Sequence, residues 1–414
     1  MTLEMPISPK VSPLRWVRLI GVLMLVGVIA GSLSAVFLLG LDAITRYHSS
    51  QPWLLLLLPM GGMAIAWLYQ TFGTLSAQGS HLLVEEIHEQ RGNVPLRMAP
   101  LVLLATWMTH LLGGSAGREG TAVQMGGAVA AWLSRVFSLP KEHQRLLLMA
   151  GMAAGFGAVF GTPWAGSIFA VELPVRGRWH TRSLLPALLA SWVGHGVCLA
   201  WGVSHTDFRS LGLTLPGLLG FSWSFFFAVV LAAIAFGLCG RFFVQLSHMS
   251  PVWFAQLSPN PLWRPFWGGL LVIVLVSLLG TADYLGLGVH ALRTGGVSLL
   301  SSFSAGGAEP WSWFWKLVFT IVTLASGFKG GEVTPLLFIG AALGNTLALA
   351  TGQPVEIFAG LGLVAVFAAA SNTPLACTIL GVEMFGSHCL AWFALACLIS
   401  YAISGREGIY KHQK

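Results

Sequence analysis

Two stretches of the sequence read GMAAGFGAVFGTPWAGSIFAVE, at residues 151–172, and GLVAVFAAASNTPLACTILGVE, at residues 362–383. Both contain Thr-Pro-x-Ala, and a Val-Glu pair begins six residues after that alanine. Each stretch also follows a glycine-rich block with a glutamate, GREGT at 117–121 and GGEVTP at 330–335. Shared membrane composition does not explain the same features in the same order, so we predict a two-fold internal repeat. In transporters built this way the binding site lies at the repeat interface, near the middle of the bilayer.

The composition of the whole chain also indicates a membrane protein. Of its 414 residues, 55% are hydrophobic and 9% are charged, against about 25% charged in ordinary soluble domains. This excludes a soluble multi-domain enzyme, a disordered chain and a secreted disulfide scaffold. The net charge of +7 comes from bases scattered in short loops, which is typical of the positive-inside rule, so we expect no nucleic-acid partner. Five cysteines lie in apolar stretches without metal-ligand spacing, and we expect buried free thiols at Cys198, Cys239, Cys377, Cys389 and Cys397.

Apolar segments recur along the chain and predict an all-α, polytopic membrane protein. The first, 19–41, has no charged residue over its length and is too long for the core of a signal peptide. The others lie near 53–72, 99–112, 121–138, 146–171, 185–203, 216–240, 266–281, 312–327, 335–351, 357–382 and 388–404. Several are shorter than the roughly 20 residues of a perpendicular span, and Gly or Pro interrupts the pattern at 113–114, 162–163, 330–331 and 373–374. Because broken helices are tolerated where they line a cavity, we expect two inverted repeats of tilted and broken helices.

The charges that flank these segments indicate how the chain is divided. Lys10, Arg15 and Arg18 precede the first apolar segment, and the last residues are basic on balance. Both ends are therefore expected in the cytoplasm, which requires an even number of crossings. We predict a cytoplasmic N-terminal segment (1–18), a single transmembrane domain (19–405, with repeats at about 19–205 and 216–405) and a cytoplasmic tail (406–414).

Glu119 is the first candidate for chemistry, because an acid at membrane depth is costly and by default functional. It lies between glycines in the block at 117–121 and precedes an uncharged run. Glycine lets backbone N–H groups crowd toward one point, and a helix N-terminus attracts anions. A carboxylate there could fill an anion's place when ionised and leave when protonated, which would couple anion to proton. The alternative is a glutamate that simply caps its own helix.

Glu332 is the matching acid in the second half, and the same two interpretations apply to it. Thr334 adds a hydroxyl donor for an anion. In the polar stretch QGSHLLVEEIHE, at residues 78–89, Ser80 and His81 could also donate to an anion. That stretch otherwise reads as a solvated helix end, or as metal ligands at His81, Glu85 and His88.

A membrane-embedded hydrolase is a further alternative. Residues 113–117 read GGSAG and fit the G-x-S-x-G pattern, with Ser115 as the nucleophile. That pattern needs a strand–turn–helix context, which the apolar segments do not provide.

At these residues the chain resembles the CLC family of anion channels and anion/proton antiporters, over nearly its whole length. Residues 117–120 resemble the family's Gly-Lys/Arg-Glu-Gly-Pro, with Thr121 in place of the proline. By this match Glu119 is the gating glutamate and proton carrier. The block at 330–335 resembles Gly-Gly-x-Phe-x-Pro, and the C-terminal segment resembles the one that bears a central anion-binding tyrosine. The resemblance thereby implies anion-binding positions at Gly117, Arg118, Gly120, Ser80, His81, Val333, Thr334 and Tyr410.

Three departures from the family pattern point to one of its branches. Gly79-Ser80-His81 stands where Gly-Ser-Gly is usual. In the block at 330–335, Glu332 occupies the variable position and Val333 replaces the phenylalanine. Leu173 aligns with the inner proton-transfer glutamate of chloride/proton exchangers. Together they resemble the fluoride-exporting bacterial branch. That resemblance implies fluoride/proton antiport by homodimers with one pathway per subunit, and Glu332 would be a second titratable group.

We therefore expect proton-coupled fluoride export across a bacterial inner membrane, without enzyme activity, cofactor or metal. The alternative with the same fold is a chloride/proton antiporter or a passive chloride channel. We also expect residues 151–172 and 362–383, which are rich in small and apolar side chains, at the subunit interface.

Overall fold

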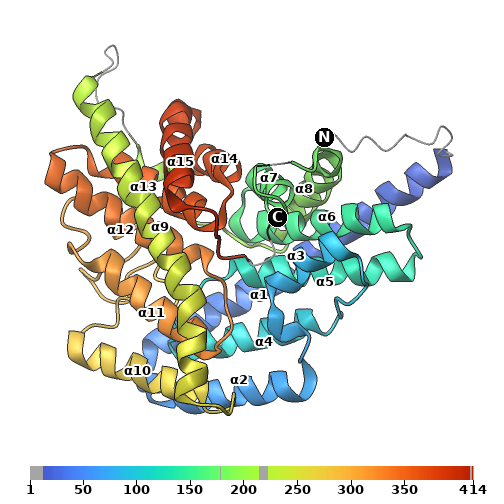
Figure 1. Cartoon of the computed structure of the whole chain (residues 1–414), viewed down its shortest axis with the longest axis horizontal. Coiled ribbons are helices and arrows are strands. Elements are labelled where there is room, and N and C mark those ends of the chain that lie inside the picture. The colour runs from blue at the N-terminus through green and yellow to red at the C-terminus, as the bar shows by residue number, and fades with distance from the viewer. Residues whose placement is uncertain (1–12, 178, 214–221, 411–412, 414) are drawn as a thin grey trace.

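The computed structural model describes residues 13–177, 179–213, 222–410 and 413 (Figure 1). Over these residues the secondary structure is helical, without strands, which confirms the all-α prediction. The helices are α1 Pro13–Ser50, α2 Leu58–Phe72, α3 Ser80–Glu89, α4 Met98–Leu111, α5 Glu119–Val136, α6 Lys141–Phe160, α7 Pro163–Glu172, α8 Leu184–Ala200, α9 Trp223–Leu257, α10 Arg264–Leu279, α11 Ser312–Ser326, α12 Val333–Thr351, α13 Val355–Ser371, α14 Pro374–Phe385 and α15 Leu390–Ser404. Short 3-10 turns join several of them.

Many of these helices are built to lie in a bilayer. Among the described residues, six helical segments are long and apolar enough to cross a membrane: Val17–Ser50, Pro52–Phe72, Thr181–Ala200, Trp223–Leu257, Val333–Thr351 and Ser387–Ser404. Large apolar side chains such as Trp67, Trp223 and Leu278 point out of the molecule. Lipid tails accept such side chains where water would not. The chain is a multi-pass membrane protein, as predicted.

The two Thr-Pro sequences each separate one helix from the next, as predicted. In the first repeat α6 ends before Gly161, which has a φ of +76°, and α7 begins at Pro163. In the second, α13 ends before Asn372, with a φ of +58°, and α14 begins at Pro374. Proline suits the first position of a helix because its fixed φ is helical and its missing N–H has no partner there anyway.

The two repeats, α5–α8 and α12–α15, occupy opposite sides of the molecule (Figure 1). Their first two helices cross in the same way. A Cβ added to Gly126 of α5 would lie 2.0 Å from the carbonyl oxygen of Gly151 in α6, and a Cβ on Gly340 of α12 would lie 2.1 Å from that of Gly362 in α13. Only glycine therefore fits at both crossings, where the two backbones touch.

Two glutamates show that the repeats run in opposite directions. The carboxylate of Glu172, at the end of α7, accepts hydrogen bonds from the N–H groups of Leu375 and Ala376 at the start of α14, at 3.2 and 2.8 Å. The carboxylate of Glu383, near the end of α14, accepts from Trp164 and Ala165 at the start of α7, at 3.1 and 2.7 Å. Each helix thus begins where the other ends, so α7 and α14 are antiparallel and the repeats are inverted.

Three segments differ from the sequence-based expectations. Residues 80–89 form a helix whose apolar side, with Leu83 and Ile87, is buried, so this stretch is more than a solvated helix end. The segment expected to end near 240 continues as α9 to Leu257, and its expected start at 216 lies outside the described residues. Residues 406–410 are no free tail, because Ile409 and Tyr410 are buried and the Ile409 N–H donates to the Ala370 carbonyl oxygen at 2.8 Å. Residues 1–12 of the expected N-terminal segment also lie outside the described part.

Candidate anion pathway

Glu119 is the first residue of α5, and its side chain is buried against the second repeat. The Thr334 hydroxyl donates to the carboxylate oxygens at 2.7 and 2.6 Å, and the Thr334 N–H donates to Oε2 at 3.1 Å. The N–H of Arg118 donates to the same oxygen at 3.2 Å, and the Arg118 Nε lies 3.4 Å from Oε1. Glu119 therefore caps α12, a helix of the other repeat, rather than its own helix. Its carboxylate fills a place that suits any small anion.

Two backbone hydrogen bonds join the glycine-rich blocks beside this carboxylate. The N–H of Gly117 donates to the Gly331 carbonyl oxygen at 2.6 Å, and the N–H of Gly331 donates to the Gly117 carbonyl oxygen at 2.8 Å. A Cβ on Gly120 would lie 3.0 Å from the Gly331 Cα. Glycines at 117, 120 and 331 thus let the N-termini of α5 and α12 meet at one point, where a bulkier residue would separate them.

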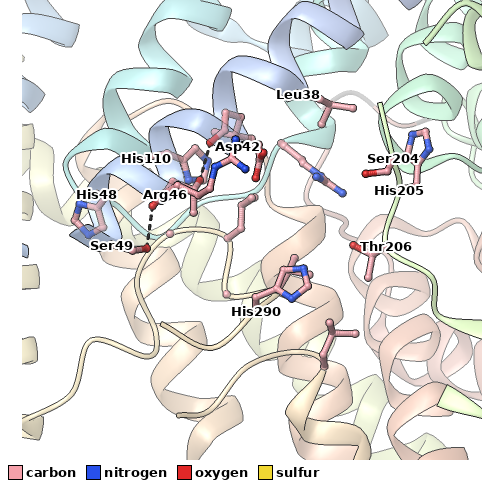
Figure 2. Close-up of a pocket in the computed structure, with 18 of the residues that line it drawn as sticks. Leu38, Asp42, Arg46, His48, Ser49, His110, Ser204, His205, Thr206 and His290 are labelled. Carbon is pink, nitrogen blue, oxygen red and sulfur yellow. Dashed lines mark hydrogen bonds and ion pairs between the residues drawn. The ribbon is translucent and has the colours of Figure 1, made fainter. Parts of the chain in front are cut away.

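Two cavities that share no lining residue approach Glu119. The first, of about 890 Å³, is lined by the end of α1, by Arg118, and by four histidines, His48, His110, His205 and His290 (Figure 2). The second, of about 280 Å³, is lined by Glu332 and by the C-terminal segment that includes Tyr410. Glu119 lines neither cavity and is inaccessible to solvent. Arg118, next to Glu119 in the sequence, lines the first cavity, and Glu332, two residues before Thr334, lines the second, so the Glu119–Thr334 contact lies close to both.

The second cavity gathers four of the predicted site residues, Ser80, His81, Glu332 and Tyr410. The Ser80 hydroxyl accepts a hydrogen bond from the Gln124 side chain at 3.4 Å. The ring of Tyr410 packs edge-on against Phe169, with 5.9 Å between ring centroids. Residues from α3, α12 and the C-terminal segment, which are far apart in the sequence, thus meet in one place.

Glu332 occupies the N-cap position of α12, but its side chain makes no capping hydrogen bond. It is half-buried and faces the second cavity. Its Oε2 would lie 3.7 Å from a Cβ on Gly120, which places it close to the start of α5. Val333, the first residue of α12, is buried between Glu332 and Thr334. The alternative of a simple capping glutamate therefore lacks its capping hydrogen bond at this residue.

Two residues that the sequence analysis did not select also line the second cavity, Gln124 and Lys329. The Lys329 ammonium donates to the Ala77 carbonyl oxygen at 3.1 Å and lies 4.6 Å from the centroid of the Tyr69 ring. The sequence did hold a signal for Lys329, because it is the one base among apolar and glycine residues directly before the block at 330–335. Gln124 lies five residues after Glu119, and nothing in its local sequence marks it.

The hydrolase and the metal site that the sequence analysis offered as alternatives find no matching geometry. The Ser115 hydroxyl is buried and hydrogen-bonded to the Thr320 hydroxyl at 3.0 Å, so it is not paired with a base. Within the described residues, no three His, Cys, Asp or Glu side chains form a group that could hold a metal. The ring of His88 is instead hydrogen-bonded to the Pro174 carbonyl oxygen at 2.9 Å.

Comparisons with known proteins agree with this fold. Residues 61–405 match the family model of the voltage gated chloride channel, so the chain belongs to this family, the CLC family. A chloride/fluoride channel protein of Pseudomonas syringae pv. tomato is 45% identical over 400 residues, which is 97% of this chain and 86% of that protein. The voltage-gated ClC-type chloride channel ClcB of Escherichia coli is 27% identical over 380 residues, 87% of each chain.

Solved structures give the same result. The crystal structure of a CLC-type fluoride/proton antiporter is similar with a TM-score of 0.90 and 36% identity, over 98% of this chain and all of that one. A slow cyanobacterial Cl⁻/H⁺ antiporter has a TM-score of 0.79 at 21% identity, over 97% of both chains, which is a likeness of fold alone. The family resemblance inferred from the sequence is thus confirmed, and the chain is an anion-transport protein of the CLC family.

Proposed function

We propose that this protein exports fluoride from a bacterial cytoplasm in exchange for protons, through a pathway gated by Glu119. One observation carries the proposal. The buried carboxylate of Glu119 fills the donor group at the start of α12, close to two cavities that share no lining residue. An anion that crosses from one cavity to the other through this contact must take the place of this carboxylate.

The exchange follows from the charge of that side chain. An ionised Glu119 competes with the anion for the N–H and hydroxyl of Thr334. A protonated Glu119 has lost its charge and most of its attraction to these donors, so it yields them to the anion. If it collects its proton from one cavity and releases it to the other, protons and anions move in opposite directions. Glu332 offers a second carboxyl beside the smaller cavity, where Leu173 leaves the inner acid position empty.

Fluoride is favoured over chloride by the chemistry around Glu332. Fluoride is a small, strongly hydrated base, and its site must replace lost water with dense hydrogen-bond donors. A protonated carboxyl at Glu332 would be such a donor, and it suits a hard base better than the larger and less basic chloride. The names of the relatives agree with this choice, since the more similar ones are a chloride/fluoride channel and a fluoride/proton antiporter. Chloride/proton antiport and passive chloride conduction remain the rivals.

We further propose that the protein acts in the inner membrane as a homodimer, with one pathway per subunit. The burial of the two expected interface stretches limits which of their helices can reach a partner subunit. Nearly all of residues 151–172 and 362–383 are buried inside the subunit, so α6 and α13 have little surface left for a partner. Exposed apolar side chains lie at Trp164 on α7, which belongs to the first expected stretch, and on two helices outside both stretches, at Trp192 on α8 and Leu398 on α15.

Anion efflux from proteoliposomes tests the choice of anion. Vesicles loaded with equal concentrations of fluoride and chloride are made with the purified full-length protein, and both anions are followed with ion-selective electrodes. We expect fluoride release to be much faster than chloride release, and protein-free vesicles are the control. Equal release rates would refute fluoride selectivity and leave the CLC fold and the position of Glu119 unaffected.

A further inference from the structure

The larger cavity contains a buried histidine that the mechanism above does not use. His110, at the end of α4, is 2% exposed and lines this cavity. Its ring lies beside the Gly117 backbone, but neither ring nitrogen makes a hydrogen bond of acceptable geometry. A buried polar group without a partner is costly, and such groups in native proteins are generally satisfied by water, an ion or a ligand.

A buried ammonium lies behind the same wall of the cavity. Lys316 of α11 is inaccessible to solvent, and its Nζ donates to the carbonyl oxygens of Tyr284 and Gly286, at 3.1 and 2.8 Å. It also lies 5.5 Å from the centroid of the Phe338 ring. Among the described residues it forms no ion pair with a carboxylate. A buried positive charge without a counter-charge favours an anion nearby.

The segment between these two residues offers one more donor. Because the Gly286 carbonyl oxygen points at Lys316, the trans peptide directs the N–H of Leu287 away from it. That N–H makes no hydrogen bond within the described residues, and Gly286 and Leu287 both line the cavity. A Cβ on Gly286 would lie 4.0 Å from Nδ1 of His110, so the peptide and the imidazole are neighbours.

The charge around this place is positive. Arg118 also lines the cavity, close to His110. The two lining acids are engaged elsewhere: Asp42 is exposed and paired with Arg46 at 2.9 Å, and Asp207 accepts from the Arg209 N–H at 3.0 Å. Arg118 shares its charge with the Glu119 carboxylate, at 3.4 Å, so the positive charge left without a carboxylate partner among the described residues near this floor is that of Lys316.

We propose that His110, Arg118 and Lys316 form a second anion-binding site on the floor of the larger cavity, separate from the site at Glu119 and Thr334. It takes a small monovalent anion, fluoride in the proposed function on which this inference rests. The imidazole N–H and the Leu287 N–H donate to the anion, while the Lys316 and Arg118 charges offset its desolvation. An anion held there lies beside Arg118, next to the donors that Glu119 occupies.

Transport kinetics test this site. In proteoliposomes the half-saturating fluoride concentration is measured for the wild type, His110→Phe and Lys316→Met. Loss of one donor or of the buried charge is expected to raise it about threefold to tenfold, without changing the number of protons moved per fluoride. His290→Phe is the matched control, because His290 lines the same cavity but is exposed, and it should match the wild type.

Two conservative variants separate a binding role from a folding role. His110→Gln keeps an N–H donor and Lys316→Arg keeps the charge, so both should stay within about twofold of the wild type. Fluoride binding to the detergent-solubilised variants, measured by calorimetry, should weaken in parallel with the kinetics. Wild-type half-saturation and wild-type binding in both His110→Phe and Lys316→Met would overturn the site. A wild type that carries chloride instead would refute the proposed function, and the same variants would then be compared with chloride.

Discussion

Four glutamates occupy corresponding places in the two repeats, and three of them cap a helix of the other repeat. Glu119 caps α12, Glu172 caps α14, and Glu383 caps α7. By symmetry Glu332 should cap α5, yet it makes no capping hydrogen bond and faces the smaller cavity. Glu172 and Glu383 thus keep the symmetry and hold the two repeats together. Glu119 and Glu332, beside the proposed pathway, break it, and a titratable group on the pathway needs freedom to move.

The donor group at the start of α12 can be tested at one atom. Thr334→Val keeps the size of the side chain and removes the hydroxyl that donates to Glu119. A hydrogen bond to a charged group contributes about 1.5–3 kcal/mol, so we expect fluoride affinity to fall by about tenfold to a hundredfold. Calorimetric titration measures this. Thr346→Val is the control, because Thr346 lies farther along α12 and its hydroxyl donates to the Ala342 carbonyl oxygen of the same helix; an equal loss in both variants would contradict the assignment.

Glu332 should matter for the proton more than for the anion. Glu332→Gln keeps a hydrogen-bond donor and removes titration, so we expect coupled fluoride flux to fall severalfold while fluoride binding changes by less than about twofold. Flux is measured in proteoliposomes and binding by calorimetry on the same preparation. Glu85→Gln, an acid on the polar side of α3, should change neither quantity. If binding falls as much as flux in Glu332→Gln, the carboxylate is an anion ligand and not a proton carrier.

At the scale of elements, the antiparallel pair α7 and α14 is held by the reciprocal caps. Each carboxylate accepts two N–H groups that proline-initiated helices leave without intrahelical partners. Glu172→Ala and Glu383→Ala should each lower the free energy of unfolding by about 0.5–2 kcal/mol. Thermal unfolding in detergent checks this, with Glu407→Ala as the control because the Glu407 side chain is 77% exposed. Unchanged midpoints in both variants would show that the caps do not hold the repeats.

The helix boundaries show how far the sequence could predict the elements. The starts of α7 and α14 followed from Thr-Pro, because proline fixes the first turn locally. The length of α3 did not follow, since its polar residues conceal a short buried side with Leu83. The cross-repeat caps could not be found from local patterns either, because Glu172 and its donors are 203 and 204 residues apart. The cap that Glu119 makes on α12 also joins residues far apart in the sequence, so local patterns could not predict it.

At the scale of the whole molecule, the internal repeat and the broken helices predicted the inverted arrangement and a site at the repeat interface. The candidate residues Glu119, Glu332, Thr334 and Tyr410 followed from family-like motifs, and the structure brings them together around one point. The charged floor of the larger cavity did not follow, because Lys316 reads as one base in an apolar helix. Its importance depends on a loop about 30 residues upstream, whose carbonyl oxygens meet its ammonium.

Proton movement driven by a fluoride gradient tests the central claim most directly. Proteoliposomes with high internal and low external fluoride are clamped electrically with an ionophore, and external pH is recorded as fluoride leaves. The wild type should take up protons against no initial pH gradient, whereas Glu119→Gln, whose amide cannot titrate, should move none whether or not it still conducts fluoride. Proton uptake that persists in Glu119→Gln would contradict the account, because the proton would then cross without the proposed gating side chain.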